Sequence, residues 1–210
     1  MIYDISQTLR PDLPVWPGDT PFSLTETWSM ADGSPVTVSK LTLSTHSGAH
    51  ADAPRHYSQT GAASSDVALD PYIGPAVLID LSQTEGNIIT PEHLQPYAAD
   101  IGDRVILRLY QSFPHDEWVN DFRSISSLSI NFMAERGCKL VGVDTPSLDP
   151  QDSKTMDAHK AVLSADMRIL EGLVLDDVPP GAYELIALPL KLAGADASPV
   201  RAVLRTLDNV

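Results

Sequence analysis

Three of the six histidines lie close together, at positions 46, 50 and 56, with an aspartate at position 52. Gly48 and a proline within the same run disfavour a helix, so we expect a strand that leads into a loop. On a strand His50 and Asp52 point to one side, and Gly48 lets the backbone fold His46 toward them. Two imidazoles and a carboxylate are a normal ligand set for a hydrolytic Zn²⁺ or similar divalent metal with an open position. The alternative is three solvated loop histidines beside a turn-forming aspartate.

Two residues of the C-terminal half could complete this ligand set. His159 follows Asp157, which we expect to cap a short helix, and Glu171 lies inside the apolar run 169–175. A carboxylate is costly to bury unless a cation pairs with it. Taken singly, Glu171 is compatible with a solvent-facing position on an edge strand, and His159 with an ordinary helix surface. Taken together, they supply the ligands for a second metal bridged by Asp52, and paired hydrolytic metals lie about 3.5–4 Å apart.

A hairpin is expected shortly before the histidine cluster. From Phe22 to Met30 the apolar residues occupy alternate positions, which is typical of a half-buried strand. A turn at residues 32–35 follows, and Val36 to Thr45 reads as the partner strand. The apolar phase of this second run shifts, which indicates a bulge near Lys40 or burial of both faces.

The rest of the chain contains more strand-like runs than helical ones. Further strands are expected at residues 76–81, 104–110, 139–143, 169–175, 184–190 and 200–206. Helices are expected to start at Thr90-Pro91 and to cover 129–136 before Gly137, and Asp157 is expected to cap a helical turn that runs through His159 to Leu163. This pattern predicts one strand-rich α/β domain over residues 1–210, with helices packed on a face of the strands.

Two polar residues outside the clusters have ordinary structural explanations. Asp144 closes a predicted strand, where turn capping and a place near the site are both compatible with the sequence. Ser198 precedes a proline and lacks the Gly-x-Ser-x-Gly context of a nucleophile, so we expect it in a loop.

The composition restricts the partners and the compartment. The chain has 14 Lys and Arg against 28 Asp and Glu, a net charge of −14, and such an acidic surface repels nucleic acid. Its apolar runs fall far short of the roughly 18 residues of a membrane span, and its first ten residues do not resemble a secretion signal. The single cysteine, Cys138, is expected to be a packing residue. We therefore expect a cytoplasmic protein with no nucleic-acid or membrane partner.

The run from His46 to His56 reads His-x-Gly-Ala-His-x-Asp-x-Pro-x-His and resembles the signature of the cyclase-like metal-dependent hydrolases. Further matching segments are 15–19 (VWPGD), 142–147 (GVDTPS), 187–190 (ALPL) and 194–202 (GADASPVRA). These motifs are similar to those of the prokaryotic-type kynurenine formamidases (arylformamidases) in particular, in the same order over nearly the whole chain. That family often has threonine where this chain has Ala49, which is not a ligand position.

The resemblance implies both a fold and an activity. The fold would be a layered β/β/α domain of the swivelling type, assembled as a homodimer with two zinc ions per chain. Manganese or iron would suit the same ligands. The activity would be hydrolysis of N-formyl-L-kynurenine, at a linear C–N bond, to L-kynurenine and formate, a step of tryptophan catabolism in the kynurenine pathway.

The resemblance also implies a role for seven residues. One zinc would be held by His46, His50 and Asp52, and the other by Asp52, His159 and Glu171. His56 would be the proton donor and acceptor, and Trp16 would contact the substrate. Two alternatives stay open, namely a related amidohydrolase that opens a cyclic amide such as isatin, and a metal-binding module without catalysis.

Overall fold

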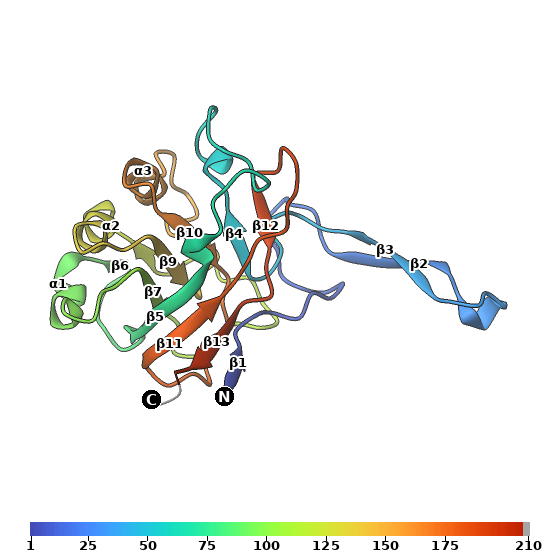
Figure 1. Cartoon of the computed structure of the whole chain (residues 1–210), viewed down its shortest axis with the longest axis horizontal. Helices are drawn as coiled ribbons and strands as arrows, with labels where there is room; N and C mark the ends of the chain where they lie inside the picture. The colour runs from blue at the N-terminus through green and yellow to red at the C-terminus, as the bar shows by residue number, and fades with distance from the viewer. Residues whose placement is uncertain (208–210) are drawn as a thin grey trace.

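The centre of the computed structural model, which describes residues 1–207, is a nine-stranded sheet (Figure 1). From one edge to the other its strands are β1 (Ile2–Asp4), β13 (Val203–Thr206), β11 (Gly181–Ile186), β5 (Ile73–Asp80), β7 (Arg104–Arg108), β9 (Leu140–Val143), β10 (Arg168–Glu171), β4 (His50–Asp52) and β12 (Ala197–Pro199). The four strands from β5 to β10 are parallel, and the strands on both sides of them pair antiparallel.

Three short helices lie side by side along one face of this sheet (Figure 1). They are α1 (Pro91–Leu94), α2 (Ser127–Ala134) and α3 (Asp157–Ser164), and a two-stranded parallel pair, β6 (Ile88–Ile89) and β8 (Ser124–Ile125), accompanies them. Helix α2 starts at Ser126, whose hydroxyl accepts the Ser129 N–H, and it ends before Gly137 at φ 88°. Within residues 1–207, no helix is long and apolar enough to cross a membrane.

The core has two parts, one on each face of the sheet. Successive residues of a strand point to opposite faces, so Val105 and Leu107 pack with the helices while Ile106 joins the cluster on the other face. Cys138 is buried in the helix-side cluster, as expected of a packing residue. The strand-rich α/β fold predicted from the sequence is confirmed.

Most predicted strands are present, with two corrections of detail. The run 169–175 forms a strand only as far as Glu171, because Gly172 adopts φ 67° and turns the chain out of the sheet. Ser198, expected in a loop, lies buried in β12.

Asp144 is also buried, and its carboxylate accepts the backbone N–H groups of Leu109 and Tyr110 just beyond β7. Burial raises the pKa of Asp144 to about 7.

The predicted hairpin exists, but its predicted burial is wrong. Strands β2 (Ser23–Trp28) and β3 (Val38–Thr42) pair antiparallel and project from the body as an arm, here called the hairpin arm (Figure 1). Every residue of both strands is exposed, because no other element of residues 1–207 covers them. The irregularity expected near Lys40 falls on the opposite strand, between Glu26 and Trp28.

Candidate metal centre

Strand β4 places two of the predicted ligands at the centre of a three-strand neighbourhood. His50 lies opposite Glu171 on β10, and Asp52 lies opposite Ile169 on the same strand. His50, Asp52 and Glu171 are all buried. The alternative of a solvated loop is therefore wrong for His50 and Asp52, and the edge-strand alternative is wrong for Glu171, because β10 is paired on both sides.

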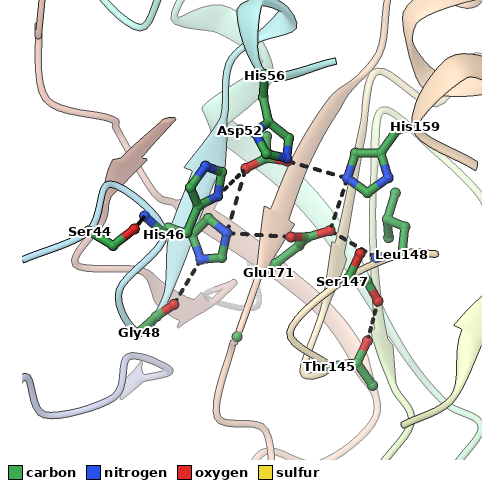
Figure 2. Close-up of polar contacts among 12 residues, drawn as sticks. Ser44, His46, Gly48, Asp52, His56, Thr145, Ser147, Leu148, His159 and Glu171 are labelled. Atoms are coloured by element: carbon green, nitrogen blue, oxygen red, sulfur yellow. Dashed lines mark hydrogen bonds and ion pairs between the residues drawn. The ribbon is translucent and has the colours of Figure 1, made fainter. Parts of the chain in front are cut away.

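Asp52 is the residue on which the imidazoles converge (Figure 2). Its Oδ1 lies 3.2 Å from His46 Nδ1 and 3.5 Å from His50 Nε2. Its Oδ2 lies 3.4 Å from His159 Nε2. Glu171 closes the ring, with Oε2 3.4 Å from His50 Nε2 and Oε1 3.5 Å from His159 Nε2. We call His46, His50, Asp52, His159 and Glu171 the metal cradle, because the structure brings all five predicted ligands together.

The polar atoms at the centre of the cradle suit a cation. Both carboxylate oxygens of Asp52 and Nε2 of His50 are buried and have no hydrogen-bond partner among the described residues. The surrounding imidazole nitrogens are near, but their geometry falls short of hydrogen bonds. Buried polar atoms without partners are rare, since each costs about 1–3 kcal/mol or more when charged. A divalent metal would satisfy all three atoms.

Two different trios of side chains are close enough to share one ion. His50, Asp52 and Glu171 form one trio, and His46, Asp52 and His56 form the other, with the ligand atoms of each within 4.8 Å of one another. Asp52 belongs to both trios. The second trio includes His56, which the sequence analysis takes as the proton carrier, so the role of His56 requires a test of its own.

In each imidazole of the cradle, the ring nitrogen that points away from the Asp52 and Glu171 carboxylates lies close to a hydrogen-bond acceptor. His50 Nδ1 lies 2.9 Å from the Gly48 carbonyl oxygen, and His46 Nε2 lies 3.2 Å from Asp196 Oδ2. His159 Nδ1 lies 2.6 Å from Asp149 Oδ2. Such partners fix the ring orientation and the tautomer of metal-binding histidines. Asp149 and Asp196 were not identified from the sequence. Asp196 lies within one of the family-like segments, 194–202, whereas no motif marks Asp149.

Helix α3 delivers His159, and its start differs from the expected one. Asp157 is the first helical residue, and the preceding Met156 has φ 51° and provides no side-chain cap. The cap comes from Asp149, whose carboxylate accepts the N–H groups of Ala158 and His159. The same carboxylate therefore caps the start of the helix and holds the His159 ring. His159 is buried, so its expected alternative as a surface residue is wrong.

The charges of the cradle support one another. Burial alone would lower the pKa of His46 and of His159, but the carboxylates beside them raise the pKa values to about 9 and about 10. Burial alone would raise the pKa of Asp52, yet His159 and His46 hold it well below its usual range. Burial likewise opposes ionisation of Asp196, but His46 and Thr45 lower its pKa to about 2. The imidazoles and carboxylates of the cradle therefore favour each other's charged forms.

Two close glycines join the segments that carry the ligands. Gly172, directly after Glu171, adopts φ 67°, and a Cβ placed there would lie 2.6 Å from the Gly48 carbonyl oxygen. That carbonyl is the one facing His50 Nδ1. Gln7 adds a bond from its Nε2 to the Gly172 carbonyl oxygen at 2.9 Å. The close approach of the two backbones therefore helps to set the position of His50.

The cradle opens into a cavity of about 540 Å³. His56 lines it with 31% of its side chain exposed, and Trp16 lines it as the sequence analysis expects. Trp118, which was not identified from the sequence, meets Trp16 edge to face at 5.4 Å between ring centroids. The Trp118 indole N–H donates to Gln151 Oε1 at 2.8 Å. The cavity thus combines a polar, metal-type end with aromatic walls, which suits hydrolysis of a polar bond attached to an aromatic group.

Comparison with known proteins agrees with this geometry. The family model Cyclase, described as "Putative cyclase", matches residues 3–150. The chain is 59% identical to the kynurenine formamidase of Maricaulis maris, over 98% of both chains. It is 53% identical to that of Erythrobacter litoralis, over 99% of this chain and 95% of the relative. It is 52% identical to that of Sphingopyxis alaskensis, over 98% of both.

Solved structures share the fold. A predicted metal-dependent hydrolase from Bacillus stearothermophilus superimposes with a TM-score of 0.82 at 28% identity, over 97% of both chains. Isatin hydrolase A from Labrenzia aggregata superimposes with a TM-score of 0.83 at 24% identity, over 97% of this chain and 93% of that one. The second likeness concerns the fold alone. The nine-stranded architecture is therefore that of metal-dependent hydrolases.

Proposed function

The chain belongs to the Cyclase family, and from this premise we propose that it hydrolyses N-formyl-L-kynurenine to L-kynurenine and formate with bound divalent metal. The observation that carries the proposal is the buried Asp52 carboxylate, which has no hydrogen-bond partner within residues 1–207 and is ringed by imidazoles beside an aromatic cavity. The relatives named for this activity match essentially the full chain. The reaction is an amide hydrolysis and belongs to tryptophan catabolism by the kynurenine pathway.

The metal cradle would hold two zinc ions. We assign one ion to His46, His50 and Asp52, and the other to Asp52, His159 and Glu171. The two carboxylates would offset part of the charge of two dications, and Asp52 would lie between them. Manganese or iron would fit the same nitrogen and oxygen donors, so metal analysis of the purified protein decides the element.

His56 is assigned the proton transfers. Bound metal would lower the pKa of a water molecule to about 7 and would polarise the formyl oxygen. His56 Nε2 faces the cradle, 4.0 Å from Asp52 Oδ2. It would accept the proton of the attacking water and return it to the aryl nitrogen as the C–N bond breaks, so that the products are formate and the free aniline. Its partial exposure leaves room for substrate beside the ring.

The aromatic wall would orient the substrate. The kynurenine ring would pack against Trp16, while the formamide projects toward the cradle. Aromatic pairs contribute about 0.5–1.5 kcal/mol beyond the area they bury. Because Trp118 is fixed by Gln151, it supports the position of Trp16 from the other side.

The decisive experiment is turnover of N-formylkynurenine by the purified protein, with zinc, manganese and iron measured on the same sample. Isatin serves as the competing substrate. We expect formate and kynurenine to appear at a rate that falls on chelation and returns on addition of metal. Turnover of isatin with none of N-formylkynurenine would contradict the assignment, and turnover that persists after complete metal removal would contradict the metal dependence.

We propose further that the chain is a homodimer and works in the cytoplasm. The exposed apolar residues of the hairpin arm support the dimer, with Leu24 54%, Trp28 60% and Leu41 56% exposed. An isolated two-stranded hairpin is marginally stable in water, so this arm needs a covering surface. Light scattering should give a molar mass of twice 22.7 kDa for the wild type. A Leu24→Asp, Leu41→Asp double variant should give the mass of one chain. Cell fractionation tests the compartment.

A further inference from the structure

Among the histidines of the site, two share a single partner. His50 and His159 each have an acceptor of their own, Gly48 and Asp149. His46 Nε2 and His56 Nδ1 instead face the same oxygen, Asp196 Oδ2, at 3.2 and 3.6 Å. The two rings lie 4.3 Å apart between centroids. One carboxylate is thus in contact with a predicted metal ligand and with the predicted proton carrier.

The fold holds Asp196 firmly in this position. It directly precedes β12, whose Ala197 lies opposite Asp52 on β4. Its carbonyl oxygen accepts the Ala53 N–H at 2.8 Å. The Thr45 hydroxyl donates to Oδ1 at 2.9 Å and so sets the rotation of the carboxylate. Strand pairing therefore fixes the backbone of Asp196, and Thr45 turns its second oxygen toward the two rings.

We infer that Asp196 is a positioning residue that orients His46 and His56 together. This inference rests on the proposed function, because it concerns the proton carrier of that reaction. A carboxylate beside an imidazole favours the tautomer whose N–H points to it, which leaves the opposite nitrogen with its lone pair free. For His46 the free atom is Nδ1, the atom 3.2 Å from Asp52. For His56 it is Nε2, which also faces Asp52.

Asp196 contacts the metal ligand His46 more closely than the proton carrier His56, and this difference suits their two roles. The 3.2 Å contact with His46 is a hydrogen bond, whereas 3.6 Å to His56 is too long for one. Asp196 thus orients His56 through its charge and leaves the ring able to tilt between water and leaving group. Because one carboxylate contacts both His46 and His56, it keeps the proton-accepting Nε2 of His56 directed toward the metal cradle.

The experiment compares Asp196→Asn and Asp196→Ala with Asp149→Asn, whose carboxylate holds the His159 ring and caps helix α3 but does not contact His56, and with Asp66→Asn, an exposed loop aspartate, as the neutral control. Zinc affinity is measured by chelator competition. The kcat and KM for N-formylkynurenine are measured at saturating zinc with occupancy verified. Two-bond ¹H–¹⁵N spectra of the imidazole rings report the tautomer of His56, which a merely structural role would not change.

We expect both Asp196 variants to lose about tenfold in zinc affinity and, at full occupancy, about ten- to a hundredfold in kcat with little change in KM. The His56 spectrum should lose its Nδ1–H tautomer. Asp149→Asn should lose zinc affinity as well, but with the His56 tautomer unchanged. Recovery of kcat in the Asp196 variants, with the His56 tautomer unchanged, would overturn the link to His56. If the wild type fails to hydrolyse the substrate, the proposed function fails, while the tautomer and zinc measurements still decide the role of Asp196.

Discussion

The metal cradle and the hairpin arm are built from the same kind of sequence and have opposite surroundings. In both, short extended runs place alternate residues on one side of a strand. Strand β4 is paired on both sides and wholly buried, whereas β2 and β3 pair only with each other and are wholly exposed. An alternating pattern therefore specifies which residues share a face. What covers that face depends on strands far away in the sequence, or on another molecule.

The largest effect should come from breaking the cradle at its shared residue. Asp52→Asn would remove the carboxylate charge that we propose to lie between two metal ions, so that their repulsion would no longer be offset there. We expect metal content and turnover to fall together, with kcat reduced by about a thousandfold or more. Metal analysis and turnover on one sample check this. A variant that keeps two metals and wild-type turnover excludes the bridging role.

The next prediction separates the proton carrier from the ligands. His56→Ala should leave metal content near normal and lower kcat by about 10²–10⁴-fold, the usual contribution of a positioned proton-transfer group. The matched comparison is His46→Ala, which should lose metal as well. If His56→Ala loses metal in proportion to activity, the trio of His46, Asp52 and His56 is a metal site and our assignment is wrong.

A pair of glycine variants compares the two regions directly. Gly172 and Gly33 both have positive φ, but a Cβ at Gly172 meets backbone at 2.6 Å, whereas at Gly33, in the hairpin arm, it meets nothing within 4 Å. Gly33→Ala should therefore cost only the left-handed strain, about 1–2 kcal/mol of unfolding free energy. Gly172→Ala adds overpacking and should cost about 2–5 kcal/mol, with weaker metal binding. Denaturant titration of both variants measures this, and equal losses would show that the contact with Gly48 is unimportant.

The smallest effect is expected at the aromatic wall. Trp16→Ala should lower kcat/KM by roughly ten- to a hundredfold on an aryl formamide and only slightly on a small aliphatic one. The matched control is Trp28→Ala on the hairpin arm, 60% exposed, which should leave kcat/KM within about twofold on either substrate. Equal losses on both substrates together with a large fall in Tm would identify Trp16 as a packing residue.

The sequence predicts local features of this protein better than its long-range ones. The paired β2 and β3, the end of α2 shortly before Gly137 and the strand containing His50 all follow from residue type and spacing within about ten positions. The strand prediction for 169–175 extends too far, because the apolar pattern continues while Gly172 already turns the chain. Strand β12 is missed because it is three residues long and contains a proline.

In the candidate site, too, the residues of a local motif were predicted better than the residues that contact them. His46, His50, Asp52 and His56 share one short motif. His159 and Glu171 were found separately, the first after Asp157 and the second as a carboxylate inside an apolar run, and the resemblance then assigned all of them their roles. Asp149 and Asp196 were missed as partners of these histidines. Asp196 meets His46 only after segments 150 residues apart come together, and Asp149, ten residues before His159, lies in no recognisable motif. No local pattern distinguishes an aspartate that receives a ring N–H from one that faces solvent.

The placement of β4 between β10 and β12 also affects how the chain folds. Thr45 and His46 meet Asp196 across 151 and 150 residues of chain, so a large loop must close before these contacts form. Contacts of such high sequence separation slow folding, and we expect β12 to dock late, after the parallel strands have formed. Metal bound to the cradle would then stabilise mainly the native state and not the transition state. Its kinetic signature would be slower unfolding at an almost unchanged refolding rate.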